Sequence, residues 1–249
     1  MIRFAQTLCL LLGRCGVMLL TPAIAIAQPA TAVSRATSAL RSPAAATDLL
    51  RLGQSSVGAP LPVGWRSRSV RGQGAPMTVI IDSAGLRYLH VSGAARAAWF
   101  VRELDMPLSR DGNLSWQWRV PLAPVGADIG SKASDDAALR VFVVFGRRGM
   151  LDGAPRALFY TIANGRPAVT DPTATDQRRF GVVSAGHPDL ARDWVGVSVN
   201  PFADYRRFWH ADADRIVAVG IMQDTDQTLS PAVGDVLTLE WRPNSAPRP

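Results

Sequence analysis

Three charged residues, Asp135, Asp136 and Arg140, stand at the beginning of an apolar segment and could carry chemistry. If this segment is a strand, Asp136 and Arg140 point to the same face with Cα atoms about 13 Å apart, too far for direct pairing. Arg140 then needs an acid from a neighbouring strand or from a ligand, because an unpaired arginine near a core is costly. The favoured interpretation is a buried ion pair that clamps two strands, and contact with a ligand is the alternative.

A second candidate follows the apolar segment that ends at Met222, where Asp224, Asp226 and Thr228 stand at alternate positions. Three oxygen-bearing side chains with this spacing suit Ca²⁺. An EF-hand is excluded, since Leu229 stands where that loop requires glycine. Asp224 and Asp226 are therefore candidate ligands of a generic calcium or polar-ligand site. An Asx-type turn that ends the strand is the alternative, and the pattern favours it.

Tryptophan is the third group of interest, because the chain has 7 tryptophans although only 7% of its residues are aromatic. Exposed tryptophans stack on sugars in many sandwich domains, whereas tryptophans at strand spacing usually belong to the core. Trp116 and Trp118 alternate with polar residues. We therefore predict that these two lie in the core.

Sequence signatures of common enzymes are missing. The chain contains no Gly-x-Ser-x-Gly elbow, no His-Glu-x-x-His and no phosphate-binding loop, and its 3 histidines are scattered. Asp135, Asp136, Asp224 and Asp226 could still converge as the paired carboxylates of a polysaccharide hydrolase or lyase. The prediction is a non-catalytic protein, with this enzyme class as the alternative.

Short strands are the elements that must position these residues. Within 114–120, apolar Leu114, Trp116 and Trp118 alternate with polar residues, which predicts a half-buried strand. Asn200 and Pro201 are suited to begin one helix. Ten segments separated by turn signals predict strands, at 77–81, 87–92, 97–103, 114–120, 138–145, 157–162, 180–184, 194–199, 216–222 and 236–241. The fold prediction is all-β, an antiparallel β-sandwich with one short helix.

The N-terminus resembles a secretory signal peptide. Arg3 is followed by an apolar stretch at 8–20, and Ala25-Ile26-Ala27 has the form of a signal-peptidase site. We expect a signal peptide at 1–27, an Ala/Pro/Ser/Thr-rich linker at 28–60 with a short helix near 47–52, the sandwich at 61–243, and a disordered tail at 244–249. The expected location is the periplasm or the exterior of the cell. Cleavage would remove both cysteines.

Charge and hydropathy exclude two classes of function. The chain of 249 residues has a formal net charge of +7, but its arginines are spread along the sequence. A nucleic-acid-binding protein would concentrate them in a patch, so no nucleic-acid partner is expected. No apolar run reaches the roughly 18 residues of a membrane-spanning helix, so the chain is not expected to be an integral membrane protein.

Several of these motifs together resemble a family of exported bacterial proteins, domain of unknown function 3047. The similarity covers about 64–241 and is carried by Leu114-x-Trp116-x-Trp118-Arg119-Val120, by Lys132 with Asp135-Asp136-x-Ala138-x-Arg140-Val141-x-Val143-x-Phe145, by Asp204-Tyr205 and by Asp224-Thr225-Asp226-x-Thr228. The resemblance implies a jelly-roll-like sandwich and carries no established activity.

The leading hypothesis is an exported, non-catalytic β-sandwich that binds a glycan or another small polar ligand through Asp135, Asp136, Arg140, Asp224 and Asp226. No cofactor is required, although Ca²⁺ fits Asp224 and Asp226. The alternatives are an envelope polysaccharide hydrolase or lyase that uses the same aspartates, and a structural envelope protein with no small ligand. Nothing in the sequence identifies the ligand or the oligomeric state. The hypothesis requires segments 132–145 and 216–228 to lie side by side.

Overall fold

The computed structural model describes residues 45–70, 74–104, 108, 110, 112–146, 156–165 and 180–244. The expected signal peptide at 1–27, the linker up to residue 44 and residues 245–249 of the expected tail lie outside these ranges. Within them, no helix is both long enough and apolar enough to cross a membrane.

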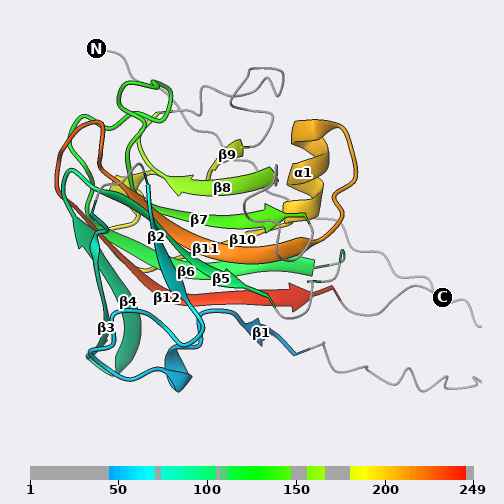
Figure 1. Cartoon of the computed structure of the whole chain (residues 1–249), viewed down its shortest axis with the longest axis horizontal. Coiled ribbons are helices and arrows are strands. Elements are labelled where there is room, and N and C mark those ends of the chain that lie inside the picture. The colour runs from blue at the N-terminus through cyan, green and yellow to red at the C-terminus, as the bar shows by residue number, and fades with distance from the viewer. Residues whose placement is uncertain are drawn as a thin grey trace, which may run out of the picture. The chain divides into compact units, whose positions relative to one another are not determined.

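The described residues form two six-stranded sheets that pack face to face around one main core (Figure 1). The first sheet has the order β10-β6-β12-β4-β3, and β1 also pairs with β12. Its strands are β1 (Thr47–Asp48), β3 (Met77–Ser83), β4 (Leu86–Gly93), β6 (Gly112–Leu122), β10 (Val195–Val199) and β12 (Ala232–Pro243).

The second sheet has the order β2-β5-β11-β7-β8-β9, and its only parallel pair within the described ranges is β8 with β9. Its strands are β2 (Arg66–Ser69), β5 (Ala97–Glu103), β7 (Ala137–Phe145), β8 (Arg156–Ile162), β9 (Phe180–Ser184) and β11 (Ile216–Asp224). The described part of the chain has one α-helix, α1 (Pro201–Trp209). The predicted jelly-roll-like β-sandwich with one short helix is confirmed.

Side-chain alternation explains how the strands are oriented. In β6, Leu114, Trp116 and Trp118 are at most 1% exposed and enter the core, as predicted. The intervening Gln117 is exposed. In β7 and β11 every residue is buried, because both strands lie in the middle of their sheet and are covered on both faces.

Helix α1 begins where the sequence predicts. The Asn200 side chain accepts a hydrogen bond from the Ala203 N–H at 3.0 Å, and Pro201 occupies the first turn. Tyr205 on the buried face packs edge-on against Phe145, with ring centroids 4.7 Å apart. The helix thus covers the end of β7 that is distant from Asp136.

The segment 45–60, which the sequence places in the linker, packs against the sandwich. Thr47–Asp48 pairs with β12, and a 3-10 helix follows at Leu52–Gln54, where the sequence suggested a short helix near 47–52. Leu49 and Leu50 are each 1% exposed within the main core. Burying these leucines favours an ordered segment despite the surrounding linker-like composition.

Candidate ligand-binding site

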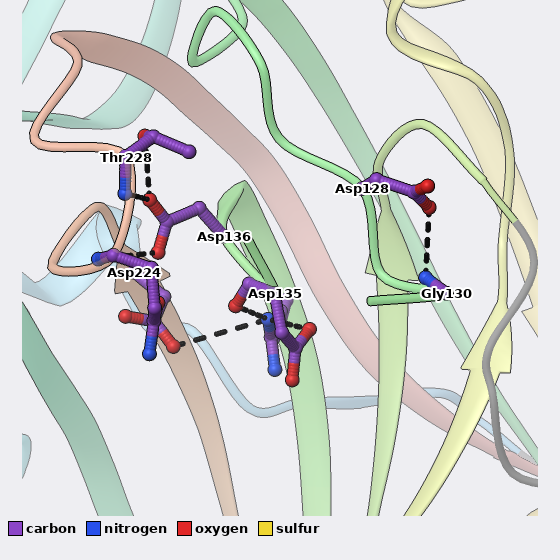
Figure 2. A network of polar contacts seen from close by, with 8 residues as sticks. Asp128, Gly130, Asp135, Asp136, Asp224 and Thr228 are labelled. Carbon is purple, nitrogen blue, oxygen red and sulfur yellow. Dashed lines mark hydrogen bonds and ion pairs between the residues drawn. The ribbon is translucent and has the colours of Figure 1, made fainter. Parts of the chain in front are cut away.

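The two charged segments lie side by side, as the hypothesis requires. Strands β7 and β11 are antiparallel neighbours, with Met222 opposite Arg140 and Asp224 opposite Ala137. The end of β11 and the loop that follows it therefore meet the beginning of β7 (Figure 2). Residues about 90 positions apart in sequence form one cluster, because strand pairing brings their chain ends together.

Arg140 is held in a nearly closed environment. Its Nη2 donates to the Asp135 carboxylate at 2.7 Å and to the Asp135 carbonyl oxygen at 2.8 Å. The Asp224 carboxylate on the neighbouring strand lies 3.8 Å away, and the Arg140 side chain is only 6% exposed. Arg140 is therefore in a buried ion pair, but its short contact is with Asp135, five residues earlier in the chain, and its contact with the neighbouring strand is the longer one to Asp224.

Asp136 fastens the loop after β11 to the start of β7. Its carboxylate accepts hydrogen bonds from the Gln227 N–H at 3.2 Å, the Thr228 N–H at 2.7 Å and the Thr228 hydroxyl at 2.6 Å (Figure 2). The residue is 0% exposed. These bonds give partners to two backbone N–H groups and one hydroxyl of the half-buried loop.

Burial makes the cluster electrostatically unfavourable for negative charge. Desolvation raises the pKa of Asp224 to about 7; Arg140 opposes this shift, whereas the charges of Asp226 and Asp136 and a hydrogen bond with Asp226 reinforce it. Burial also raises the pKa of Asp135, and Arg140 again opposes the rise. Four carboxyl groups share the cluster with a single guanidinium, so one of them is readily kept protonated.

The raised pKa of Asp224 predicts how the free energy of unfolding of the metal-free protein, kept so by a chelator, depends on pH. Asp224 remains protonated in the folded chain up to about pH 7, whereas its unfolded value is near 3.8. The folded state binds the additional proton within this window, so Asp224 makes the free energy of unfolding fall as the pH rises through it. Between pH 4 and pH 8, this effect should lower the free energy of unfolding of the wild type by roughly 4 kcal/mol. Asp224→Asn should remove that decline. Urea unfolding of the wild type and of Asp224→Asn across this pH range measures the difference. If the free energies of unfolding of the two proteins changed in parallel with pH, the prediction would be contradicted.

Access to the cluster is limited for a ligand larger than an ion. The Asp135 side chain is 37% exposed, but those of Arg140 and Asp224 are only 6% and 10% exposed. Asp136, Asp224 and Asp226 each place one carboxylate oxygen within 4.8 Å of the others. A hydrolase needs two carboxyl groups about 5 to 10 Å apart across an open cleft, whereas Asp136 and Asp224 are buried.

A separate pocket of about 430 Å³ lies between β1, the 3-10 helix, the β3–β4 hairpin and β12. Its polar lining consists of Asp48, Asp82, Arg87, Thr238 and Glu240, and its apolar lining is leucine. Arg87 donates to the Asp82 carboxylate at 3.1 Å. The sequence interpretation missed this site, because β1 was placed in the linker. The only available signal was the polar alternation of Thr238 and Glu240 along β12.

A buried carboxylate on the first sheet was also missed. Asp235, whose side chain is 2% exposed, accepts a hydrogen bond from Arg119 at 2.7 Å and lies 2.7 Å from the His90 ring nitrogen. The Arg119 guanidinium lies over the Trp194 and Tyr88 rings, 4.6 and 5.1 Å from their centroids. The sequence analysis named Arg119 only within a family motif, and its partners come from β12, from β4 and from the residue just before β10.

Known structures with a similar fold include carbohydrate-related domains. The family 11 carbohydrate-binding module of the cellulase Lic26A-Cel5E of Clostridium thermocellum is 12% identical, with 81% of this chain and 96% of the module covered and a TM-score of 0.43. The xyloglucanase domain of NopAA from Sinorhizobium fredii is 11% identical, with 82% and 100% covered and a TM-score of 0.40. The CBM22-1 xylan-binding domain of Paenibacillus barcinonensis Xyn10C is 13% identical, with 74% and 88% covered and a TM-score of 0.35. Likeness at this level carries no argument about ligand or activity.

Comparison with sequence families identifies the family of the chain. No curated protein matches the chain. One family model, described as protein of unknown function (DUF3047), matches residues 63–237. This range contains both β7 and β11, together with Asp135, Asp136, Arg140, Asp224 and Asp226. The chain belongs to the DUF3047 family.

Proposed function

We propose that this protein is an exported, non-catalytic β-sandwich that binds a glycan or another small polyhydroxylated ligand. The observation that carries the proposal is the pocket of about 430 Å³ beside β12. Its volume lies within the range of small-molecule sites, roughly 300 to 1,000 Å³. Its carboxylates would accept hydrogen bonds from ligand hydroxyls, and its leucines would pack against the carbon skeleton of a sugar.

In this proposal the predicted Asp/Arg cluster anchors a loop and does not contact the ligand directly. Asp135 and Asp226 are the half-buried members, whereas Asp136, Arg140 and Asp224 are nearly enclosed. We therefore assign direct ligand contacts to the pocket. The cluster anchors the loop between β11 and β12, because Asp136 binds that loop at Gln227 and Thr228.

Export is supported by the N-terminal sequence. Arg3, the apolar stretch at 8–20 and Ala25-Ile26-Ala27 together have the pattern of a cleaved secretory signal. A protein released into the periplasm or outside the cell would encounter polysaccharides of the envelope or the surroundings. Mass spectrometry of the protein from its producing cell should find Gln28 as the first residue, and an uncleaved N-terminus would contradict export by this route.

A glycan array followed by calorimetric titration of the best glycan tests the binding function. Glu240→Gln and Asp82→Asn should each weaken binding about tenfold, because each removes a charge-assisted acceptor from the pocket. Asp189→Asn is the matched control, since that carboxylate is 72% exposed on a different segment. Absence of any bound glycan would overturn the function. Weakening by Asp135→Asn, with no effect of the pocket variants, would move the site to the Asp/Arg cluster.

A further inference from the structure

We propose that Asp136, Asp224 and Asp226 bind one divalent cation with the preferences of Ca²⁺, which locks the loop after β11 onto the start of β7. The first support is geometric, because the three residues each offer a carboxylate oxygen, and these oxygens lie within 4.8 Å of one another. Calcium binds oxygen at about 2.3–2.6 Å, so two ligands of one ion lie up to about 5 Å apart. A single ion can therefore reach all three.

The second support is the enclosed carboxylate of Asp224. The residue is 7% exposed, and its buried Oδ1 accepts no hydrogen bond from a donor in the described chain; the side chain beside it is Asp226, itself a proposed ligand. Its other oxygen lies 3.8 Å from the Arg140 guanidinium. A buried anionic oxygen without a partner is costly, and a coordinated cation would compensate that cost directly.

Charge balance indicates that the ion is divalent. Arg140 makes its short ion pair with Asp135, at 2.7 Å, which neutralises both groups. Once all three are ionised as ligands, Asp136, Asp224 and Asp226 contribute a formal charge of −3 in a largely buried position, which a monovalent ion balances poorly. Carboxylate oxygens select hard cations such as Ca²⁺ and Mg²⁺ over metals that prefer nitrogen or sulfur.

Enclosure of the ligands favours Ca²⁺ over Mg²⁺. Mg²⁺ dehydrates reluctantly and usually keeps several waters, whereas Ca²⁺ accepts irregular sets of protein oxygens. Asp136 is 0% exposed and Asp224 is 7% exposed, which leaves little room for a hydrated ion. Gln227 adds a buried amide oxygen in the same loop, with no hydrogen-bond partner among the described residues.

The bound ion would hold the loop between β11 and β12 against the start of β7. Asp136 precedes β7, Asp224 ends β11 and Asp226 belongs to the loop, so one ion would join three segments. Hydrogen bonds from Gln227 and Thr228 to Asp136 already hold the same loop (Figure 2). The ion would bind only the folded chain, because the unfolded chain does not bring Asp136 to the other two, and it would therefore stabilise the fold.

A thermal melt of the full protein tests the site without any glycan, so its outcome is independent of the proposed binding function. After removal of metal with a chelator, Ca²⁺ at about 100 times its dissociation constant should raise Tm by roughly 5–10 °C, and equal Mg²⁺ should raise it less. Asp226→Asn should abolish the rise. The control Asp212→Asn should preserve it, since that side chain is 65% exposed and pairs with Arg206.

Metal stoichiometry of the wild-type protein keeps the proposal testable even if the Asp226 variant does not fold. Native mass spectrometry should find one Ca²⁺ per chain at the concentration that raises Tm. An unchanged Tm together with no bound Ca²⁺ would overturn the proposal. So would a rise of the same size in Asp226→Asn.

Discussion

Replacing Arg140 with alanine is expected to lower the free energy of unfolding by about 4 kcal/mol at pH 8, in the range for breaking one side of a buried ion pair. The guanidinium lies 2.7 Å from Asp135 and 3.8 Å from Asp224, and its own side chain is 6% exposed. Its removal leaves the buried Asp224 carboxylate beside other acids, with no compensating charge from β7. Urea unfolding at pH 8 in the presence of a chelator measures the effect.

The loss should be smaller at pH 5 than at pH 8. The pKa of Asp224 is about 7 in the wild type, so at pH 5 this carboxyl is mostly protonated and needs the guanidinium less. Arg140→Lys serves as the matched variant, since it keeps the charge but cannot reproduce the geometry of the guanidinium. A near-neutral effect of Arg140→Ala at both pH values would mean that the ion pair does not clamp β7 to its neighbour.

Gly220→Ala is expected to destabilise the chain by about 3 kcal/mol, although it adds a single methyl group to a strand. Gly220 lies in the middle of β11, opposite Phe142 of β7 and Val101 of β5. A Cβ atom there would overlap the Phe142 ring and lie 2.7 Å from the Phe100 carbonyl oxygen. The ring and the backbone of a central sheet would both have to move, and this sheet carries Asp224 and Arg140.

Gly196→Ala is the control for this effect, because it makes the same change in a strand of the other sheet. In the described structure a Cβ atom at Gly196 would meet no heavy atom within 4 Å. Its effect should stay within about 1 kcal/mol and be stabilising, since alanine lowers the entropy of the unfolded chain. Chemical denaturation of both variants decides the matter, and equal stability of the two would refute the packing explanation.

Local patterns predicted most of the strands and the helix. In β6 the alternation of Leu114, Trp116 and Trp118 with polar residues encodes which face enters the core, and in α1 Asn200 and Pro201 encode the start of the helix. These signals depend on neighbours within a few residues. The packing of Leu49 and Leu50 escaped prediction, because a two-residue strand in an alanine-rich stretch has almost no periodicity.

The site was only partly accessible to the same reasoning. The sequence singled out Asp135, Asp136, Arg140, Asp224 and Asp226 from their residue types and their positions at strand ends. It did not indicate that Asp135 would be the main partner of Arg140, or that Asp136 would accept hydrogen bonds from the loop at Gln227 and Thr228. Those outcomes depend on how the chain turns before β7, and residue types do not specify that turn.

The sequence by itself determined the class of fold, the family and the acids and arginine that would gather where β7 meets β11, because periodicity and residue chemistry are local properties. Tertiary structure alone decided how enclosed that cluster is, and it alone formed the pocket lined by Asp48, Asp82 and Glu240. Burial and cavities arise between segments that are distant in sequence, so their depth depends on strand order and register. The same dependence raises the pKa of Asp224 to about 7, since desolvation exists only once the sheets have packed.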